Sequence, residues 1–184
     1  MGIGNECWVS MAIDEEDGIP RRLIVMGVTG CGKTTVGALL AGRLGARFLD
    51  GDDYHPKANV EKMASGTPLT DEDRWPWLDR LGQVMNEAVA ESGRAVLACS
   101  ALRRVYRERL TEGSEAAPLF IHLTGPRELI HSRMAARRDH YMPTALLDSQ
   151  IATLEDLAPV ENAMTIQIND TADQIVERIL QTLR

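Results

Sequence analysis

Residues 27–34 place a lysine and a threonine directly after a glycine-rich turn, a combination suited to binding phosphate. The segment reads Gly-Val-Thr-Gly-Cys-Gly-Lys-Thr and fits the phosphate-binding loop pattern G-x-x-x-x-G-K-[ST] at every fixed position. Glycines let backbone N–H groups turn toward an anion, and a following helix N-terminus adds to the attraction. Lys33 can reach the β- and γ-phosphates of ATP, and the Thr34 hydroxyl can ligate Mg²⁺. The residues predicted to contact ATP here are Gly27, Val28, Thr29, Gly30, Cys31, Gly32, Lys33, Thr34 and Thr35.

An acidic cluster at residues 50–55, Asp-Gly-Asp-Asp-Tyr-His, follows the next apolar segment. Phosphoryl transfer depends on positioning and on neutralising charge more than on covalent help from the protein. Asp52 is the candidate to accept or orient the proton of the attacking hydroxyl, or to hold a magnesium-bound water. Aspartate is also common in turns, so a loop-capping role is the alternative for Asp52, Asp50 and, most of all, Asp53.

These segments are positioned by apolar runs that alternate with helical patterns along the chain. The alternation predicts an α/β domain of three layers, with a five-stranded parallel sheet flanked by helices. The polar clusters after the first three strands then fall at the carboxyl ends of the strands, where such sheets bind ligands. The strands are expected at residues 23–26, 47–49, 95–99, 119–123 and 164–168.

Several helix ends carry local signals. Gly45 is a plausible stop for the helix after the glycine-rich loop, and Thr70 begins a segment with helix-start chemistry. Thr171 with Gln174 predicts a capping box for the last helix, and Ser100 is a candidate N-cap after the third strand. Pro76 lies in a short first segment or marks a kink.

Composition limits the remaining possibilities. The 184 residues suit one domain, and a net charge of −7 repels nucleic acid and anionic lipid. No apolar run approaches the ~18 residues that a membrane span needs. Three scattered cysteines argue against a disulfide framework or a zinc site and indicate a cytoplasmic protein. We expect a loosely ordered extension over residues 1–20 and one P-loop domain over residues 21–184.

The glycine-rich loop by itself does not separate the classes of P-loop protein. The guanine-reading Asn-Lys-x-Asp stretch of GTPases is absent, and the third strand does not end in the acidic residue typical of an ATPase magnesium site. The cluster at residues 50–55 is therefore the best source of carboxylates near the phosphates.

Further segments make the chain resemble the gluconate kinases of the P-loop, thermoresistant type. The similarity covers roughly residues 22–184. It is carried by Asp50-Gly51-Asp52-Asp53-Tyr54-His55-Pro56, by residues 59–69, 71–78, 99–103 and 106–107, and by His140, Leu146-Leu147, Ser149-Gln150 and Leu154-Glu155. The resemblance implies ATP- and Mg²⁺-dependent phosphorylation of D-gluconate at its 6-hydroxyl, a small lid and a homodimer.

The resemblance also implies roles for particular side chains. His55 would hydrogen-bond sugar hydroxyls, unless it only closes its loop. The gluconate carboxylate needs a cation, for which Arg74, Arg103 and Arg107 are the candidates and Lys62 a further one. Arg74 and Arg107 are favoured because they fall in the matching segments. Arg103 and Arg107, four residues apart, would share a helical face. In related small-metabolite kinases, arginines placed like Arg133 and Arg137 cover the nucleotide as the lid closes.

Two alternatives remain open at this point. The chain could be another small-molecule kinase of the same fold, acting on shikimate or a nucleoside monophosphate. It could also be a nucleotide-binding regulatory module without turnover, although Lys33, Thr34 and Asp52 speak against that interpretation.

Overall fold

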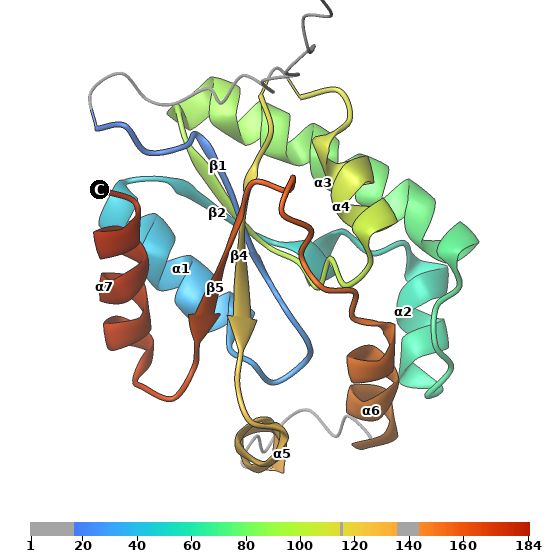
Figure 1. The fold of residues 1–184 in the computed structure, drawn as a ribbon. Helices are drawn as coiled ribbons and strands as arrows, with labels where there is room; N and C mark the ends of the chain where they lie inside the picture. The colour runs from blue at the N-terminus through green and yellow to red at the C-terminus, as the bar shows by residue number, and fades with distance from the viewer. Residues whose placement is uncertain (1–16, 115, 136–143) are drawn as a thin grey trace, which may run out of the picture.

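A single parallel sheet organises the computed structural model, which describes residues 17–114, 116–135 and 144–184 (Figure 1). The strands lie in the order β2-β3-β1-β4-β5, and every neighbouring pair is parallel. The predicted five-stranded sheet is therefore confirmed. Its strands are β1 (Arg22–Met26), β2 (Arg47–Asp50), β3 (Ala95–Ala98), β4 (Leu119–Thr124) and β5 (Ala163–Gln167).

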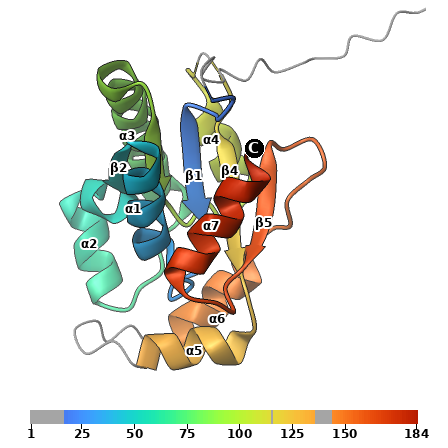
Figure 2. The same ribbon diagram turned by 90° about the vertical axis from the view of Figure 1, so that its left-hand side faces the viewer.

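Helices cover both faces of the sheet (Figures 1 and 2). α1 packs beside α7 on one face, and α3 packs beside α4 on the other. α5 and α6 lie beyond the carboxyl ends of the strands. The described helices are α1 (Lys33–Leu44), the 3₁₀ turn η1 (Gly51–Tyr54), α2 (Lys57–Ala64), α3 (Asp71–Ser92), α4 (Arg104–Thr111), α5 (Arg127–Ala135), α6 (Thr144–Thr153) and α7 (Ala172–Thr182).

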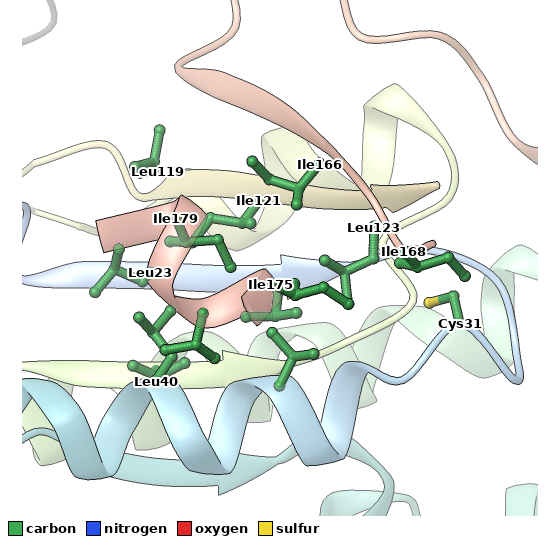
Figure 3. Close-up of a cluster of buried hydrophobic side chains, with 14 of the residues drawn as sticks. Leu23, Cys31, Leu40, Leu119, Ile121, Leu123, Ile166, Ile168, Ile175 and Ile179 are labelled. Carbon is green, nitrogen blue, oxygen red and sulfur yellow. The ribbon is translucent and has the colours of Figure 1, made fainter. Parts of the chain in front are cut away.

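The core is divided into two layers by the sheet. Leu23 belongs to the cluster between the sheet and α1 and α7, where Figure 3 shows Leu40 and Ile175 packing near it. The next residue, Ile24, belongs to the cluster on the α3 side, together with Leu81. Successive residues of a strand point to opposite faces. β1 is fully buried because helices cover both of its faces, which confirms the three-layer arrangement.

The helix-end signals are confirmed at three places. Gly45 ends α1 in the left-handed conformation with φ 62°. Thr70 forms a capping box with Asp73 at the start of α3, and Thr171 forms one with Gln174 at the start of α7. α3 then continues without a break from Asp71 to Ser92 and carries Pro76 in its second turn.

One expectation differs from the structure. Ser100 is not a helix N-cap, because α4 begins at Arg104 and the residues between form a loop in which Ala101 has φ 46°. Of the extension predicted over residues 1–20, only residues 17–20 are described, and these pack on the domain. Asp17 pairs with Arg94 at 2.7 Å, and Ile19 is buried. No helix within the described ranges combines the length and apolar composition needed to cross a membrane.

Candidate active site

The glycine-rich loop connects β1 to α1 at the carboxyl edge of the sheet. Gly27 lies against β4, and a Cβ atom there would come within 2.7 Å of the Leu123 carbonyl oxygen. Gly32 has φ 101° and directly precedes α1, so it lets the chain enter the helix from a left-handed turn. Lys33, Thr34 and Thr35 form the start of α1, with both threonines exposed. The loop therefore has the strand-turn-helix context that phosphate binding requires.

One peptide group of this loop contacts two side chains. Its carbonyl, from Val28, accepts a hydrogen bond from Lys33 Nζ at 3.0 Å. Its N–H, from Thr29, donates to Gln150 Oε1 of α6 at 2.6 Å. An ammonium group has three donors, so Lys33 can hold the loop and still donate to phosphate oxygens. Sequence reasoning assigned no role to Gln150 beyond its place in a matching segment.

The acidic cluster forms the turn η1 directly after β2. The Asp50 carboxylate accepts the Asp52 backbone N–H at 3.1 Å and so caps the turn, whereas the Asp52 side chain is exposed. Gly51 is enclosed, because a Cβ atom there would lie 2.7 Å from the Ala98 carbonyl oxygen. The structure therefore gives Asp50 the capping role and leaves Asp52 available for chemistry.

Lys33 and Asp52 lie near the same point at the end of β3. Both charges act on the thiol of Cys99, the residue that directly follows β3. Burial raises the pKa of this thiol to about 12, the negative charge of Asp52 adds to the rise, and the positive charge of Lys33 opposes it. β3 lies between β1 and β2, so the loops that carry these two charges leave the two strands that flank β3. The structure thus brings the two predicted catalytic residues to one edge of the sheet.

His55 follows η1 and stacks on the ring of Trp77, with the ring centroids 4.1 Å apart. Trp77 is part of the core and donates from Nε1 to the Gly51 carbonyl at 2.8 Å. Burial of the imidazole lowers the pKa of His55, so the ring is neutral at pH 7. Its Nδ1 atom is buried and has no hydrogen-bond partner among the described residues. A neutral imidazole held in this way can exchange hydrogen bonds with a hydroxyl group.

A polar cavity of about 400 Å³ opens between the start of α3, the entry to α4 and α6. It contains two of the predicted substrate-binding arginines, Arg74 and Arg103. The side chains that define its chemistry are Asp71, Arg74, Arg103, Tyr106, Ser149 and Thr153.

Hydrogen bonds hold the charged groups of this cavity in place. Arg103 donates from Nη1 to Asp71 at 2.5 Å, and Tyr106 donates its hydroxyl proton to the same carboxylate at 2.5 Å. The bond from Tyr106, followed by that from Arg103, lowers the pKa of Asp71, which is therefore ionised at neutral pH. Arg74 contacts the Leu69 carbonyl and the Tyr106 hydroxyl. Each guanidinium has five donors, so both arginines keep donors for a ligand.

Arg107 lies elsewhere, which argues against the predicted contact with substrate. Its side chain is 1% exposed and forms an ion pair with Glu161. It also donates to the carbonyl groups of Ala101 and Leu102 at 3.2 Å. Burial opposes ionisation of Glu161, but the bonds from Arg107 and from a backbone amide outweigh it and lower the pKa of Glu161. Arg107 therefore fixes the loop that leads to Arg103.

The Arg107→Met variant should lower the free energy of unfolding by about 3–5 kcal/mol, because it leaves the Glu161 carboxylate buried without its cation. Urea denaturation would measure the change. Arg109→Met is the matched control on the same helix, since Arg109 pairs with Asp79 at the surface and should contribute less than about 1 kcal/mol. If Arg107→Met kept full stability and lost only gluconate affinity, the original expectation of substrate contact would be restored.

The remaining predicted cations are placed as follows. Arg133 donates from Nη2 to the Ile168 carbonyl at 2.7 Å, so it holds the chain just after β5. Lys62 pairs with Asp73 at 2.5 Å, and this contact is the main cause that lowers the pKa of Asp73 to about 2. Arg137 and the rest of the predicted lid lie outside the described residues.

Comparisons with known proteins agree with this geometry. A family model for shikimate kinase matches residues 29–184. A probable gluconokinase of Xenopus tropicalis is 44% identical over 171 residues, covering 85% of this chain and 90% of that protein. The gluconokinase of Gluconobacter oxydans is 44% identical over 162 residues, covering 88% and 90%. The crystal structure of a gluconokinase from Sinorhizobium meliloti superposes with a TM-score of 0.80 at 38% identity, covering 90% of this chain and 92% of that one.

Proposed function

The chain belongs to the gluconokinase family, and we propose that it transfers the γ-phosphoryl group of ATP to the 6-hydroxyl of D-gluconate. The observation that carries the proposal is the position of the arginine-containing cavity. The helix that forms one of its walls, α6, is hydrogen-bonded to the phosphate-binding loop. An anionic acceptor bound by Arg74 and Arg103 would therefore lie beside the phosphates of ATP.

At the nucleotide end, the residues present fit a magnesium–triphosphate group. Backbone N–H groups of residues 28–34 other than Thr29, whose N–H donates to Gln150, would surround the phosphates together with Lys33. The exposed Thr34 hydroxyl at the start of α1 is the protein ligand that fits Mg²⁺. Mg²⁺ keeps most of its coordination for phosphate and water oxygens, and it would neutralise charge on the phosphates.

At the acceptor end, gluconate offers one carboxylate and several hydroxyl groups. Arg103 has a planar fork of donors that suits a carboxylate, and Arg74 is a second cation against the same Tyr106 ring, with the two guanidinium carbons 5.5 and 5.3 Å from the ring centroid. Asp71 and the His55 ring would accept or donate hydrogen bonds to hydroxyl groups. Arg103 forms ion pairs with both Asp71 and Glu155, so these two carboxylates balance the two arginines. The gluconate carboxylate would therefore be bound by the remaining N–H donors of the arginines rather than by an excess of positive charge.

The chemical step follows from these positions. The acceptor oxygen forms a bond to the γ-phosphorus while the bond from that phosphorus to the β–γ bridging oxygen breaks, and its electron pair leaves with ADP. Asp52 receives or orients the proton of the attacking hydroxyl. Lys33 neutralises charge that builds up on the phosphate oxygens, and the products are 6-phosphogluconate and ADP.

The two alternatives are weaker on specific grounds. Shikimate is also a hydroxylated carboxylate, so an arginine-containing cavity alone would suit it, and the matching family model bears its name. The relatives at 44% identity, each covered to 90% of its length, are named probable gluconokinase and gluconokinase, however. A regulatory module without turnover would not need Asp52 to be exposed beside the phosphate-binding loop.

An ADP-release assay with gluconate, shikimate and AMP as acceptors tests the proposal. We expect turnover with gluconate at a kcat of about 1–100 s⁻¹, the ordinary range for kinases, and little with the other two. Arg103→Met should raise the KM for gluconate by about 10-fold or more with little effect on the KM for ATP, because Arg103 lies in the acceptor cavity and would contact the gluconate carboxylate rather than the nucleotide. Turnover with shikimate or AMP and none with gluconate would overturn the proposal.

Three further features belong to the same proposal. The free, buried thiols of Cys31 and Cys99 favour a cytoplasmic location. Arg133 would border the nucleotide, because α5 packs against the phosphate-binding loop at Gly30, and Arg137 would close over it. The homodimer and the lid rest on the resemblance to gluconate kinases.

A further inference from the structure

The hydrogen bond between the phosphate-binding loop and α6 fixes the orientation of one amide side chain. Thr29 N and Gln150 Oε1 are 2.6 Å apart and come from residues 121 positions apart in the sequence. A backbone N–H can only donate, so the atom that faces it must be the carboxamide oxygen of Gln150. The Nε2 group of Gln150, with its two donors, is thereby directed away from the Thr29 amide.

The surroundings of Gln150 place it at the boundary between the two halves of the proposed site. The peptide group that it contacts also holds Lys33 Nζ, the group expected to bind the β- and γ-phosphates. Ser149, the preceding residue of α6, and Thr153, one turn further on, line the acceptor cavity. Figures 1 and 2 place α6 at the carboxyl edge of the sheet, where the phosphate-binding loop also lies.

We propose that Gln150 is a further catalytic residue, whose Nε2 donates a hydrogen bond to an oxygen of the phosphoryl group during its transfer. The inference rests on the proposed kinase function. In the transition state, charge is spread over the three equatorial oxygens of the transferring group. A fixed donor aimed at developing charge needs no reorientation when the reaction occurs. A carboxamide also serves this purpose without changing its own protonation state.

Two substitutions separate this role from simple anchoring of α6. Gln150→Glu keeps an oxygen that can accept from Thr29 N, but it loses both donors and adds a negative charge beside the phosphates. Gln150→Ala removes the whole carboxamide. We expect kcat to fall by about 10²-fold or more in Gln150→Glu and by about 10-fold to 10²-fold in Gln150→Ala. The KM for gluconate in Gln150→Ala should stay within about threefold of the wild type, because the lost bond belongs to the transition state.

Ile151→Ala is the matched control, since Ile151 is partly exposed on the same helix and should leave kcat unchanged. If Gln150 only anchored α6, Gln150→Ala would raise the KM for gluconate with kcat preserved, and Gln150→Glu would keep most of the activity. Either result would overturn the inference. The wild type and all variants are assayed with the acceptor that the wild type phosphorylates. A wild type that does not phosphorylate gluconate would therefore contradict the proposed substrate without affecting the test of Gln150.

Discussion

Replacing Lys33 by alanine should lower kcat by about 10³-fold or more, comparable to the loss of other single cations that neutralise a transferring phosphoryl group. The Lys33 ammonium group is positioned by the Val28 carbonyl at 3.0 Å, so it is held at the phosphate end of the loop before any reaction occurs. Alanine at residue 33 removes that charge and leaves the helix start without strain. Steady-state kinetics with gluconate and ATP would measure the loss.

The control for this prediction is Lys57→Ala, which removes a lysine that is 91% exposed at the start of α2 and should retain wild-type kinetics. Thermal unfolding should show a folded Lys33→Ala protein, because its side chain makes one hydrogen bond to the loop and is only half-buried. A variant with more than about a tenth of wild-type kcat would contradict the assigned role. A wild type that binds nucleotide through Lys33 but phosphorylates no acceptor would favour the regulatory module.

The parts of the fold that the sequence predicts well are those specified by neighbouring residues. A glycine-rich loop between an apolar strand and a helix is a local pattern, and the structure forms it as expected around Lys33. Capping boxes at Thr70 and Thr171 require only a residue three positions further on. The strands that carry Asp52 and Cys99 are short apolar runs, and the order of the sheet then places their ends side by side.

The separation of Arg103 from Arg107 shows where local reasoning fails. A spacing of four residues predicts a shared face only if both residues lie within one helix. Arg103 is the N-cap of α4, just outside it, so its side chain reaches the cavity while that of Arg107 enters the core. The partner that neutralises Arg107 is Glu161, which lies 54 residues further along the chain. The sequence contains no signal for that pairing.

The contacts of Gln150 and His55 cannot be predicted from the sequence for the same reason. The contact from Gln150 to Thr29 N connects residues 121 positions apart, and the stacking of His55 on Trp77 depends on how η1 meets α3. A glutamine on a helix surface is ordinarily solvated, and a histidine after a turn ordinarily closes that turn. The roles proposed for these two side chains depend on contacts that form only when the sheet brings distant loops together.

The Asp52→Asn variant should reduce kcat by about 10²-fold to 10⁴-fold, the range associated with loss of a general base. Asparagine has nearly the same shape and can still accept a hydrogen bond from the attacking hydroxyl, but it cannot take up its proton. The KM values for ATP and gluconate should therefore change little, and the turn should persist because Asp50 caps it through the backbone N–H of residue 52.

Asp53→Asn, at the neighbouring exposed position of the same turn, is the control and should retain most activity. A loss of less than about 10-fold in Asp52→Asn would show that this carboxylate only orients the hydroxyl, and that the proton leaves by another route.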